Sequence, residues 1–259
     1  MSVTVNRGTY PASMILLQHA GFNVATVIDV GAAEGAFFAM RRQLGLQPGA
    51  KHFFIDCMDE NAAVYLRLKQ RGFDVDHAIT AVADMVGEVE LSLDPNFYNT
   101  HIGEVQDKAP ETYSTRRVPV TTLDRIVAQH DINPPFGIKF DVQGAELAAL
   151  RGSIATLKQA AFVTAEVQVF IERDSFADLV AFMTSQGFAL FDITDIGYYP
   201  NGQIMFEVYA TFIPRQREFR RSLKWAEGAQ LDTILKSLKD RRANVIAALD
   251  SLVPDKPVT

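Results

Sequence analysis

Two acidic residues and two glycines have types and a spacing that could hold a nucleotide-like ligand. Asp29 lies near the end of a short apolar strand, Gly31 follows it, and Gly35 precedes a predicted helix. Gly31 allows a tight turn and Gly35 a close approach of helix to sheet, so we expect the backbone N–H groups of this turn, which includes Ala32 and Glu34, to face a ligand. The carboxylate of Asp29 would attract an ammonium group and repel a diphosphate. The pattern predicts a ligand with a cationic amino acid end.

The second acidic residue stands at the end of the next apolar strand. Asp56 can accept hydrogen bonds from both hydroxyls of a ribose, although alone it could equally cap the following helix. Cys57 and Met58 come next and could line an adenine ring. After a third strand, the backbone of Val82 or the carboxylate of Asp84 could bind the exocyclic amine of that ring, and an ordinary turn is the alternative there. Together with the glycine turn, these residues favour a nucleoside site.

A third group of residues could act on a hydroxyl group. Lys139 and Asp141 stand two positions apart near the end of an apolar strand, so both should lie on one face of it. Asp141 could orient or deprotonate the hydroxyl, and Lys139 could anchor Asp141 or hold an acidic group of a substrate. With equal weight, both could form a structural ion-pair network with Glu146. His101 is the alternative base, and a divalent cation shared by Asp141 and Glu166 ranks lower.

The elements that must position these residues alternate between short apolar strands and amphipathic helices. This alternation is typical of βαβ units and predicts an α/β fold with a doubly wound, mostly parallel, seven-stranded Rossmann-like sheet and an antiparallel pair at its edge. We expect strands over 26–30, 52–56, 75–79, 86–93, 137–142, 162–169, 188–193 and 204–213. We expect helices over 11–20, 36–46, 61–71, 122–130 and 174–186, with short helical pieces in 145–159.

Two segments break the alternation. Residues 94–117 are polar and without period, and an insert of this length in a compact domain predicts a candidate lid. Its asparagine and tyrosine side chains suit hydroxyl-rich molecules. After the domain 1–214, apolar residues recur at helical spacing among charged ones, which predicts a long amphipathic helical extension over 215–259. Packing of this extension on its own domain and a homodimer contact through it are equally supported.

The composition restricts the kinds of partner. The chain has 31 acidic and 25 basic side chains and a net charge of −6, which disfavours binding to nucleic acid. Its single cysteine, Cys57, cannot form an intrachain disulfide. No apolar run is long enough to span a bilayer, and residues 1–10 lack an apolar signal region. We therefore expect a cytoplasmic protein.

The segment 138–146, which reads Ile-Lys-Phe-Asp-Val-Gln-Gly-Ala-Glu, carries the most specific likeness to a known family. Together with the Asp-Val-Gly-Ala sequence at 29–32 and the pattern Gly-Phe-X-Leu-Phe-Asp-Ile at 187–193, it resembles the FkbM-type methyltransferases, a group that depends on S-adenosylmethionine. The resemblance extends over about 24–214. It implies S-adenosylmethionine as the cofactor and an O-methyltransferase that acts on a hydroxyl of a saccharide, a glycoconjugate or a polyketide-like natural product.

The chain departs from that family's pattern at two places in the cofactor segment. The family often has Asn and a small residue where Ala33 and Glu34 stand, and usually Glu followed by Pro where Asp56 and Cys57 stand. Because an aspartate is shorter by one methylene group, hydrogen bonds to a ribose require a closer backbone or a bridging water. Cofactor binding is still expected.

Two other functions remain open from the residues. A NAD-dependent oxidoreductase could use the same architecture, although Asp29 and the missing third glycine of the dinucleotide fingerprint argue against it. A non-catalytic nucleotide-binding scaffold, assembled through the C-terminal extension, would bind the cofactor without turnover.

Overall fold

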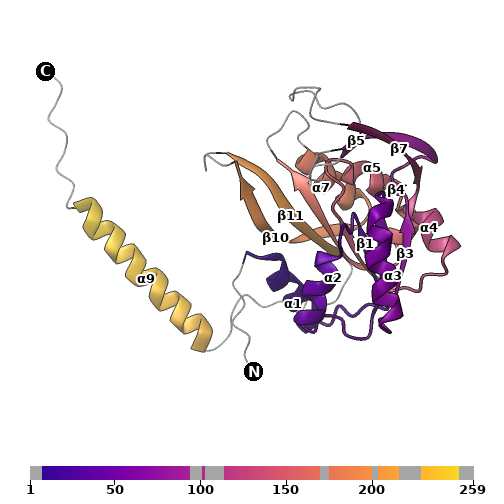
Figure 1. Cartoon of the computed structure of the whole chain (residues 1–259). Helices are drawn as coiled ribbons and strands as arrows, with labels where there is room; N and C mark the ends of the chain where they lie inside the picture. Colours follow the sequence, from indigo (N-terminus) through magenta and orange to yellow (C-terminus); the bar gives the residue numbers. More distant parts are fainter. Residues whose placement is uncertain are drawn as a thin grey trace, which may run out of the picture. The chain divides into compact units, whose positions relative to one another are not determined.

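The computed structural model describes residues 8–93, 101–102, 114–169, 175–199, 204–215 and 229–250. The chain divides into two compact units, Met1–Arg217 and Glu218–Thr259. Figure 1 shows the sheet and helices of the larger unit, and the helix α9 (Ala229–Asp250) of the smaller one.

A seven-stranded sheet with the order β10-β11-β9-β8-β1-β2-β3 forms the centre of the larger unit. Its strands are β1 (Thr26–Val30), β2 (Lys51–Asp56), β3 (Val75–Ile79), β8 (Phe136–Phe140), β9 (Ala160–Gln168), β10 (Phe188–Tyr198) and β11 (Met205–Pro214). The strands from β9 to β3 pair in parallel, whereas β11 is antiparallel to both β9 and β10. This confirms the predicted α/β fold with a mostly parallel sheet and an antiparallel pair at one end.

Helices flank this sheet along the chain. They are α1 (Tyr10–His19), α2 (Ala36–Gln43), α3 (Ala62–Gln70), α4 (Leu123–Gln129), α5 (Glu146–Arg151), α6 (Ile154–Leu157) and α7 (Ser175–Ser185), with a 3-10 turn, η1 (Asp59–Asn61), before α3. The helix α2 is shorter than predicted, because the backbone adopts a left-handed conformation at Gly45. The predicted cap of α7, Asp174, lies outside the described residues.

The central strands differ between their two faces. On one face, apolar residues such as Ile28, Ile138 and Val163 pack in the core with residues of α4, α5 and α7. On the other face, Phe54 packs with residues of α2 and α3. Buried polar side chains also belong to this second face, because they alternate with the apolar core residues along each strand: Asp29, His52, Lys139, Thr164 and Thr211. The functional side chains described below extend this polar row to the carboxyl ends of the strands.

A second, four-stranded sheet corrects part of the lid prediction. It has the order β4-β7-β5-β6, with β4 (Ala81–Val82), β5 (Gly87–Leu93), β6 (His101–Ile102) and β7 (Ser114–Thr121). Two of these strands begin inside the segment 94–117 that we expected to lack regular structure. Val118 and Val120 alternate with exposed residues of β7 and pack against Leu91 and Leu93 of β5. The rest of the predicted lid, 94–100 and 103–113, lies outside the described residues.

The smaller unit contains α9, so a C-terminal helix is present as one continuous element. It begins at Ala229, and residues 216–228 lie outside the described part of the chain. Leu235, Leu238 and Val245 are about half exposed on this helix. Among the described residues, no helix combines the length and the apolar character needed to cross a bilayer.

Candidate active site at the carboxyl edge of the sheet

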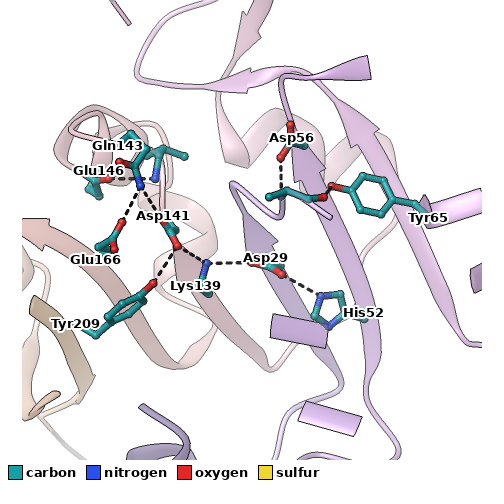
Figure 2. Close-up of polar contacts among 12 residues, drawn as sticks. Asp29, His52, Asp56, Tyr65, Lys139, Asp141, Gln143, Glu146, Glu166 and Tyr209 are labelled. Atoms are coloured by element: carbon teal, nitrogen blue, oxygen red, sulfur yellow. Dashed lines mark hydrogen bonds and ion pairs between the residues drawn. The ribbon is translucent and has the colours of Figure 1, made fainter. Parts of the chain in front are cut away.

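Three neighbouring strands end side by side and bring the predicted site residues to one edge. In the parallel registers, Val30 of β1 lies opposite Ile55 of β2 and opposite Phe140 of β8. Gly31, Asp56 and Asp141 stand within one residue of these positions, so they emerge at the same carboxyl edge. Figure 2 shows Asp29, Asp56 and Asp141 on these adjacent elements.

The turn at Gly31 is built around a contact between two backbones. Gly31 has a left-handed φ of +77°, and a Cβ added there would lie 1.8 Å from the carbonyl oxygen of Asp141. The N–H of Asp141 donates to the carbonyl oxygen of Val30 over 2.9 Å. No side chain larger than hydrogen fits between these segments, so Gly31 sets the distance between the end of β1 and the end of β8.

Four N–H groups of the glycine turn, those of Gly31, Ala32, Ala33 and Gly35, donate inside the chain, which corrects the prediction for these groups. Gly31 and Ala32 both donate to the carbonyl oxygen of Ile55, over 2.9 and 3.1 Å. Gly35 donates to the carbonyl oxygen of Ala32 over 2.9 Å, and Ala33 to Asp56 Oδ2 over 2.7 Å. These N–H groups therefore shape the loop instead of facing a ligand. Within this loop, Glu34 is exposed.

Asp56 and Tyr65 hold the backbone on both sides of Ala33. Ala33 has a left-handed φ of +45°, which is uncommon for a residue with a Cβ. Asp56 Oδ2 accepts the N–H of Ala33, and the buried Tyr65 hydroxyl donates to its carbonyl oxygen over 2.5 Å. The Tyr65 ring stacks on Phe54 of β2. Asp56 Oδ1 also accepts the N–H of Met58 over 2.7 Å, so one carboxylate ties the glycine turn to the loop after β2.

Asp29 lies elsewhere than predicted. Its side chain has no exposed surface, so it does not face a ligand directly. Lys139 Nζ lies 3.6 Å from Asp29 Oδ1, and His52 Nε2 lies 3.4 Å from Oδ2. Burial lowers the pKa of His52 despite the nearby Asp29, which leaves the imidazole neutral at neutral pH. The ammonium group that Asp29 meets is therefore the one on Lys139.

Asp141 lies at the centre of a hydrogen-bond network that joins three strands. Lys139 Nζ donates to Asp141 Oδ2 over 2.9 Å, and the hydroxyl of Tyr209, in β11, donates to the same oxygen over 3.0 Å. Gln143 Nε2 donates to Asp141 Oδ1 over 3.0 Å and to Glu166 Oε2, in β9, over 2.9 Å. Figure 2 shows these side chains converging on Asp141. The ion pair predicted between Lys139 and Asp141 is thus present.

Glu146 has a different role from the predicted ion-pair network. Its carboxylate accepts the N–H groups of Val142 and Gly144, over 3.0 and 3.1 Å, and closes the turn before α5. Gln143 and Gly144 in this turn both have left-handed φ values, 52° and 95°. Burial raises the pKa of Glu146 to about 7, against an ordinary value of 4.5. This turn aims Gln143 at Asp141 and Glu166.

A family comparison identifies the chain. The profile of the methyltransferase FkbM domain matches residues 29–190, which include both the glycine turn and the Lys139–Glu146 segment. This chain belongs to the FkbM methyltransferase domain family. No curated protein matches the chain significantly by sequence.

Solved structures of methyltransferases resemble this FkbM-domain chain at low identity. The FkbM methyltransferase of Methylobacillus flagellatus is 16% identical with a TM-score of 0.46, and the match covers 72% of this chain but only 43% of that one. An rRNA methylase of Streptococcus thermophilus is 12% identical with a TM-score of 0.47, over 83% and 100% of the two chains. A Burkholderia thailandensis 1,6-didemethyltoxoflavin-N1-methyltransferase, solved with S-adenosylhomocysteine, is 14% identical with a TM-score of 0.41, over 82% and 80%.

A second close contact between backbones lies at Gly152, just after α5. A Cβ added at Gly152 would lie 2.1 Å from the carbonyl oxygen of Ala83, so this glycine lets the end of α5 meet the segment after β4.

Val82 is buried in β4, which leaves only its backbone for a ligand. Cys57 is half-buried after β2, and burial next to Asp56 raises its pKa to about 12.

The remaining predicted base is His101, of which the structure describes only the backbone. It lies in β6, opposite Ser92 of β5. Its side chain lies outside the described residues. Within the described part of the chain, no group of three or more His, Cys, Asp or Glu side chains is arranged to hold a metal ion.

Sequence reasoning missed three residues of the site in this FkbM domain. Tyr65 and Tyr209 reach it from α3 and β11, across 32 and 68 positions of sequence from the groups they contact. For Tyr209 the signal would have been a tyrosine on the polar face of an otherwise apolar strand, whereas Tyr65 lies in an apolar cluster and gave no such signal. Gln143 belongs to the motif that carries the resemblance, but its contact with Glu166 could not be read from the sequence.

Proposed function

We propose that this protein is an S-adenosylmethionine-dependent O-methyltransferase that acts on a hydroxyl of a saccharide, a glycoconjugate or a polyketide-like natural product. The observation that carries the proposal is the surplus of carboxylates at the carboxyl edge of an FkbM methyltransferase domain. Asp29, Asp56, Asp141 and Glu166 lie along this edge, with Lys139 as the cation among them. Family membership supports S-adenosylmethionine as the methyl donor.

The charge of this edge fits a sulfonium nucleoside better than a dinucleotide. A diphosphate placed beside Asp56 and Asp141 would be repelled by both carboxylates. The N–H groups of the glycine turn, which hold the diphosphate in a dinucleotide site, are engaged by Ile55, Ala32 and Asp56. Both features argue against the NAD-dependent alternative.

Asp56 retains acceptor capacity for a ribose. Each of its oxygens accepts one backbone N–H, and the side chain of Asn61 donates a further hydrogen bond to the carboxylate. A carboxylate offers about four acceptor positions, so about one position remains for a ribose hydroxyl. Since the backbone bonds also fix the direction of the carboxylate, Asp56 is preorganised for this contact. Cys57 and the backbone of Val82 extend the site toward the base.

Bound S-adenosylmethionine supplies an electrophilic methyl group on a cationic sulfur. The chain must then position an acceptor hydroxyl in line with that group and remove its proton. Asp141, Gln143 and Glu166 offer hydrogen-bonding groups for the hydroxyl, and Gln168 and Glu207 continue this polar surface along β9 and β11, where they lie opposite each other. Carboxyl and carboxamide side chains in such a row suit an acceptor with several hydroxyls. This supports a saccharide-like acceptor.

Calorimetry with S-adenosylhomocysteine tests the proposal most directly. We expect the full chain to bind one equivalent at neutral pH and to bind NAD much more weakly. Folded protein that does not bind S-adenosylhomocysteine would contradict the proposed function. Binding without methyl transfer to any hydroxyl-bearing acceptor would instead favour the non-catalytic scaffold.

A further inference from the structure

Two carboxyl groups at the acceptor side share one amide. Gln143 Nε2 lies 3.0 Å from Asp141 Oδ1 and 2.9 Å from Glu166 Oε2, so a single NH₂ group holds both side chains next to each other. In Figure 2, Glu166 and Asp141 approach Gln143 from neighbouring strands. Both groups are largely buried, since Asp141 has a side-chain exposure of 20% and Glu166 is of intermediate exposure. The inference that follows rests on the proposed function.

The charges around the pair do not balance two ionised carboxylates. From β8, Lys139 faces the pair, but it is shared with the fully buried Asp29. From β11, Glu207 adds negative charge and Tyr209 contributes a neutral hydroxyl. His52, beyond Asp29, is neutral because it is buried. Two adjacent carboxylates that compete for one shared cation are stabilised when one proton is bound between them.

The two members of the pair are not equivalent. Asp141 accepts hydrogen bonds from Lys139 and Tyr209 on one oxygen and from Gln143 on the other. On Glu166, Gln143 is the one donor found in the described part of the chain. Burial alone would raise the pKa of Asp141, but Lys139 holds this pKa below its ordinary value. Burial, followed by the contact with Asp141, raises the pKa of Glu166. The proton therefore belongs on Glu166.

We propose that the Asp141–Glu166 pair holds one proton in the free protein, loses it when the sulfonium-bearing donor binds, and then takes the proton of the acceptor hydroxyl on Glu166. Asp141 is a positioning residue in this scheme, whereas Glu166 is a catalytic residue. In the transfer step, the acceptor oxygen forms its bond to the methyl carbon while the carbon–sulfur bond breaks and its electron pair stays on sulfur. The hydroxyl proton moves to the carboxylate of Glu166.

In-line transfer requires the positively charged sulfur of the methyl donor to lie near the Asp141–Glu166 pair. A base that reaches the acceptor hydroxyl, directly or through one water, must lie a short distance from the methyl carbon and hence from the cationic sulfur. A nearby positive charge favours the ionised form of a carboxyl group. The neutral sulfur of S-adenosylhomocysteine lacks this effect. The same proton that each turnover delivers to Glu166 is thus released when the next donor molecule binds.

Proton release during binding can be measured without knowing the acceptor. We would titrate the full chain with S-adenosylmethionine and with S-adenosylhomocysteine by calorimetry, in two neutral buffers of different ionisation enthalpy. Wild type should release more protons with S-adenosylmethionine than with S-adenosylhomocysteine, with a difference of up to about one per chain. The difference should disappear in Glu166→Gln and persist in the control Asp74→Asn, which removes an exposed acid outside the site.

The possible results separate this proposal from the proposed function. If both ligands bind with equal proton release in wild type, or if Glu166→Gln keeps the difference, the pair does not act as proposed. If neither ligand binds to folded protein, the proposed function fails and this proposal fails with it. Infrared spectra give a second readout: a protonated carboxyl band that wild type shows at neutral pH and Glu166→Gln lacks should lose intensity with S-adenosylmethionine only. Absence of that band in the free protein would also overturn the proposal.

Discussion

Asp56 has a structural role and, in our proposal, a binding role in the same carboxylate. Its oxygens accept the N–H groups of Ala33 and Met58 and a hydrogen bond from Asn61, and we assign the remaining acceptor position to a ribose. Burial raises the pKa of Asp56, and the two backbone hydrogen bonds oppose this shift. A substitution at this position therefore affects the loop as well as the ligand.

For Asp56→Ala we predict weaker S-adenosylhomocysteine binding and a less stable fold. The hydrogen bonds that Ala33, Met58 and Asn61 donate to a charged acceptor are lost, each contributing about 1.5–3 kcal/mol, and the ribose loses its acceptor. Affinity should fall at least about tenfold, which corresponds to about 1.4 kcal/mol. Calorimetry and chemical unfolding measure both effects. Asp74→Ala removes an exposed acid and should leave both unchanged; equal losses in the two variants would remove Asp56 from the site.

Glu146 should make stability depend on pH. Its pKa in the folded chain is about 7, above the ordinary value of 4.5 expected when unfolded. Between these values the folded state binds more protons, so the contribution of Glu146 is fully present below about pH 4.5 and is lost as the pH rises through about 7. The difference amounts to up to about 3 kcal/mol. Glu146→Gln should remove this slope from the pH dependence of the unfolding free energy. An identical slope in both proteins would contradict the assignment.

At the scale of elements, the strands of the parallel sheet were the most predictable part. The bounds predicted for β1 and β3 agree with the structure. β1 is a short, mostly apolar run that ends at a glycine turn, which leaves few alternatives. The sequence analysis did not predict β7. Its two buried residues, Val118 and Val120, stand next to Arg117 and Pro119 in a polar segment, so the apolar alternation is too short to indicate a strand. The order of the strands cannot be derived from local pattern.

Site residues that follow recognisable strands were predictable, whereas those whose position depends on the strand order were not. Asp56, Lys139 and Asp141 follow the ends of recognisable strands, so their meeting at one edge could be predicted from the parallel fold. Tyr209 reaches Asp141 only because β11 inserts next to β9, which depends on the order of the sheet. The burial of Asp29 was not predictable either, because it depends on how α1 and α2 cover that face.

The glycine turn provides a test of element packing. Gly31→Ala would place a Cβ against the backbone of Asp141 at a left-handed position, whereas Gly72→Ala adds a Cβ at a similar φ of +84° with nothing within 4 Å. We expect Gly72→Ala to cost about 1–2 kcal/mol and Gly31→Ala clearly more, with loss of S-adenosylhomocysteine binding. Chemical unfolding and calorimetry compare the two variants. Equal destabilisation would show that the contact between β1 and β8 can relax.

At the scale of the whole molecule, the site belongs to the larger unit. Every residue that we place in the network lies within Met1–Arg217. The FkbM family match ends at residue 190, so Tyr209 and β11 add a part of the site beyond the matched segment.

Removal of the smaller unit should leave cofactor binding intact. We expect a chain that ends at Arg217 to bind S-adenosylhomocysteine with an affinity within about threefold of the full chain, which is less than about 0.7 kcal/mol. Calorimetry on both forms provides the measurement. A large loss would give the C-terminal extension a role in the site. Solution masses of the two forms test the homodimer prediction, which requires a dimer that is lost on truncation.

The main-chain contact between Gly31 and Asp141 has a consequence for the choice of acceptor. In the proposed site, the donor side and the acceptor side of the edge are spaced by peptide groups, which all amino acids share, and not by side chains. On this proposal, we expect substitutions at Gln168 or Glu207 to change which molecule is recognised without altering the distance that a methyl group must cross. Such a scaffold can acquire new acceptors while its reaction geometry stays constant.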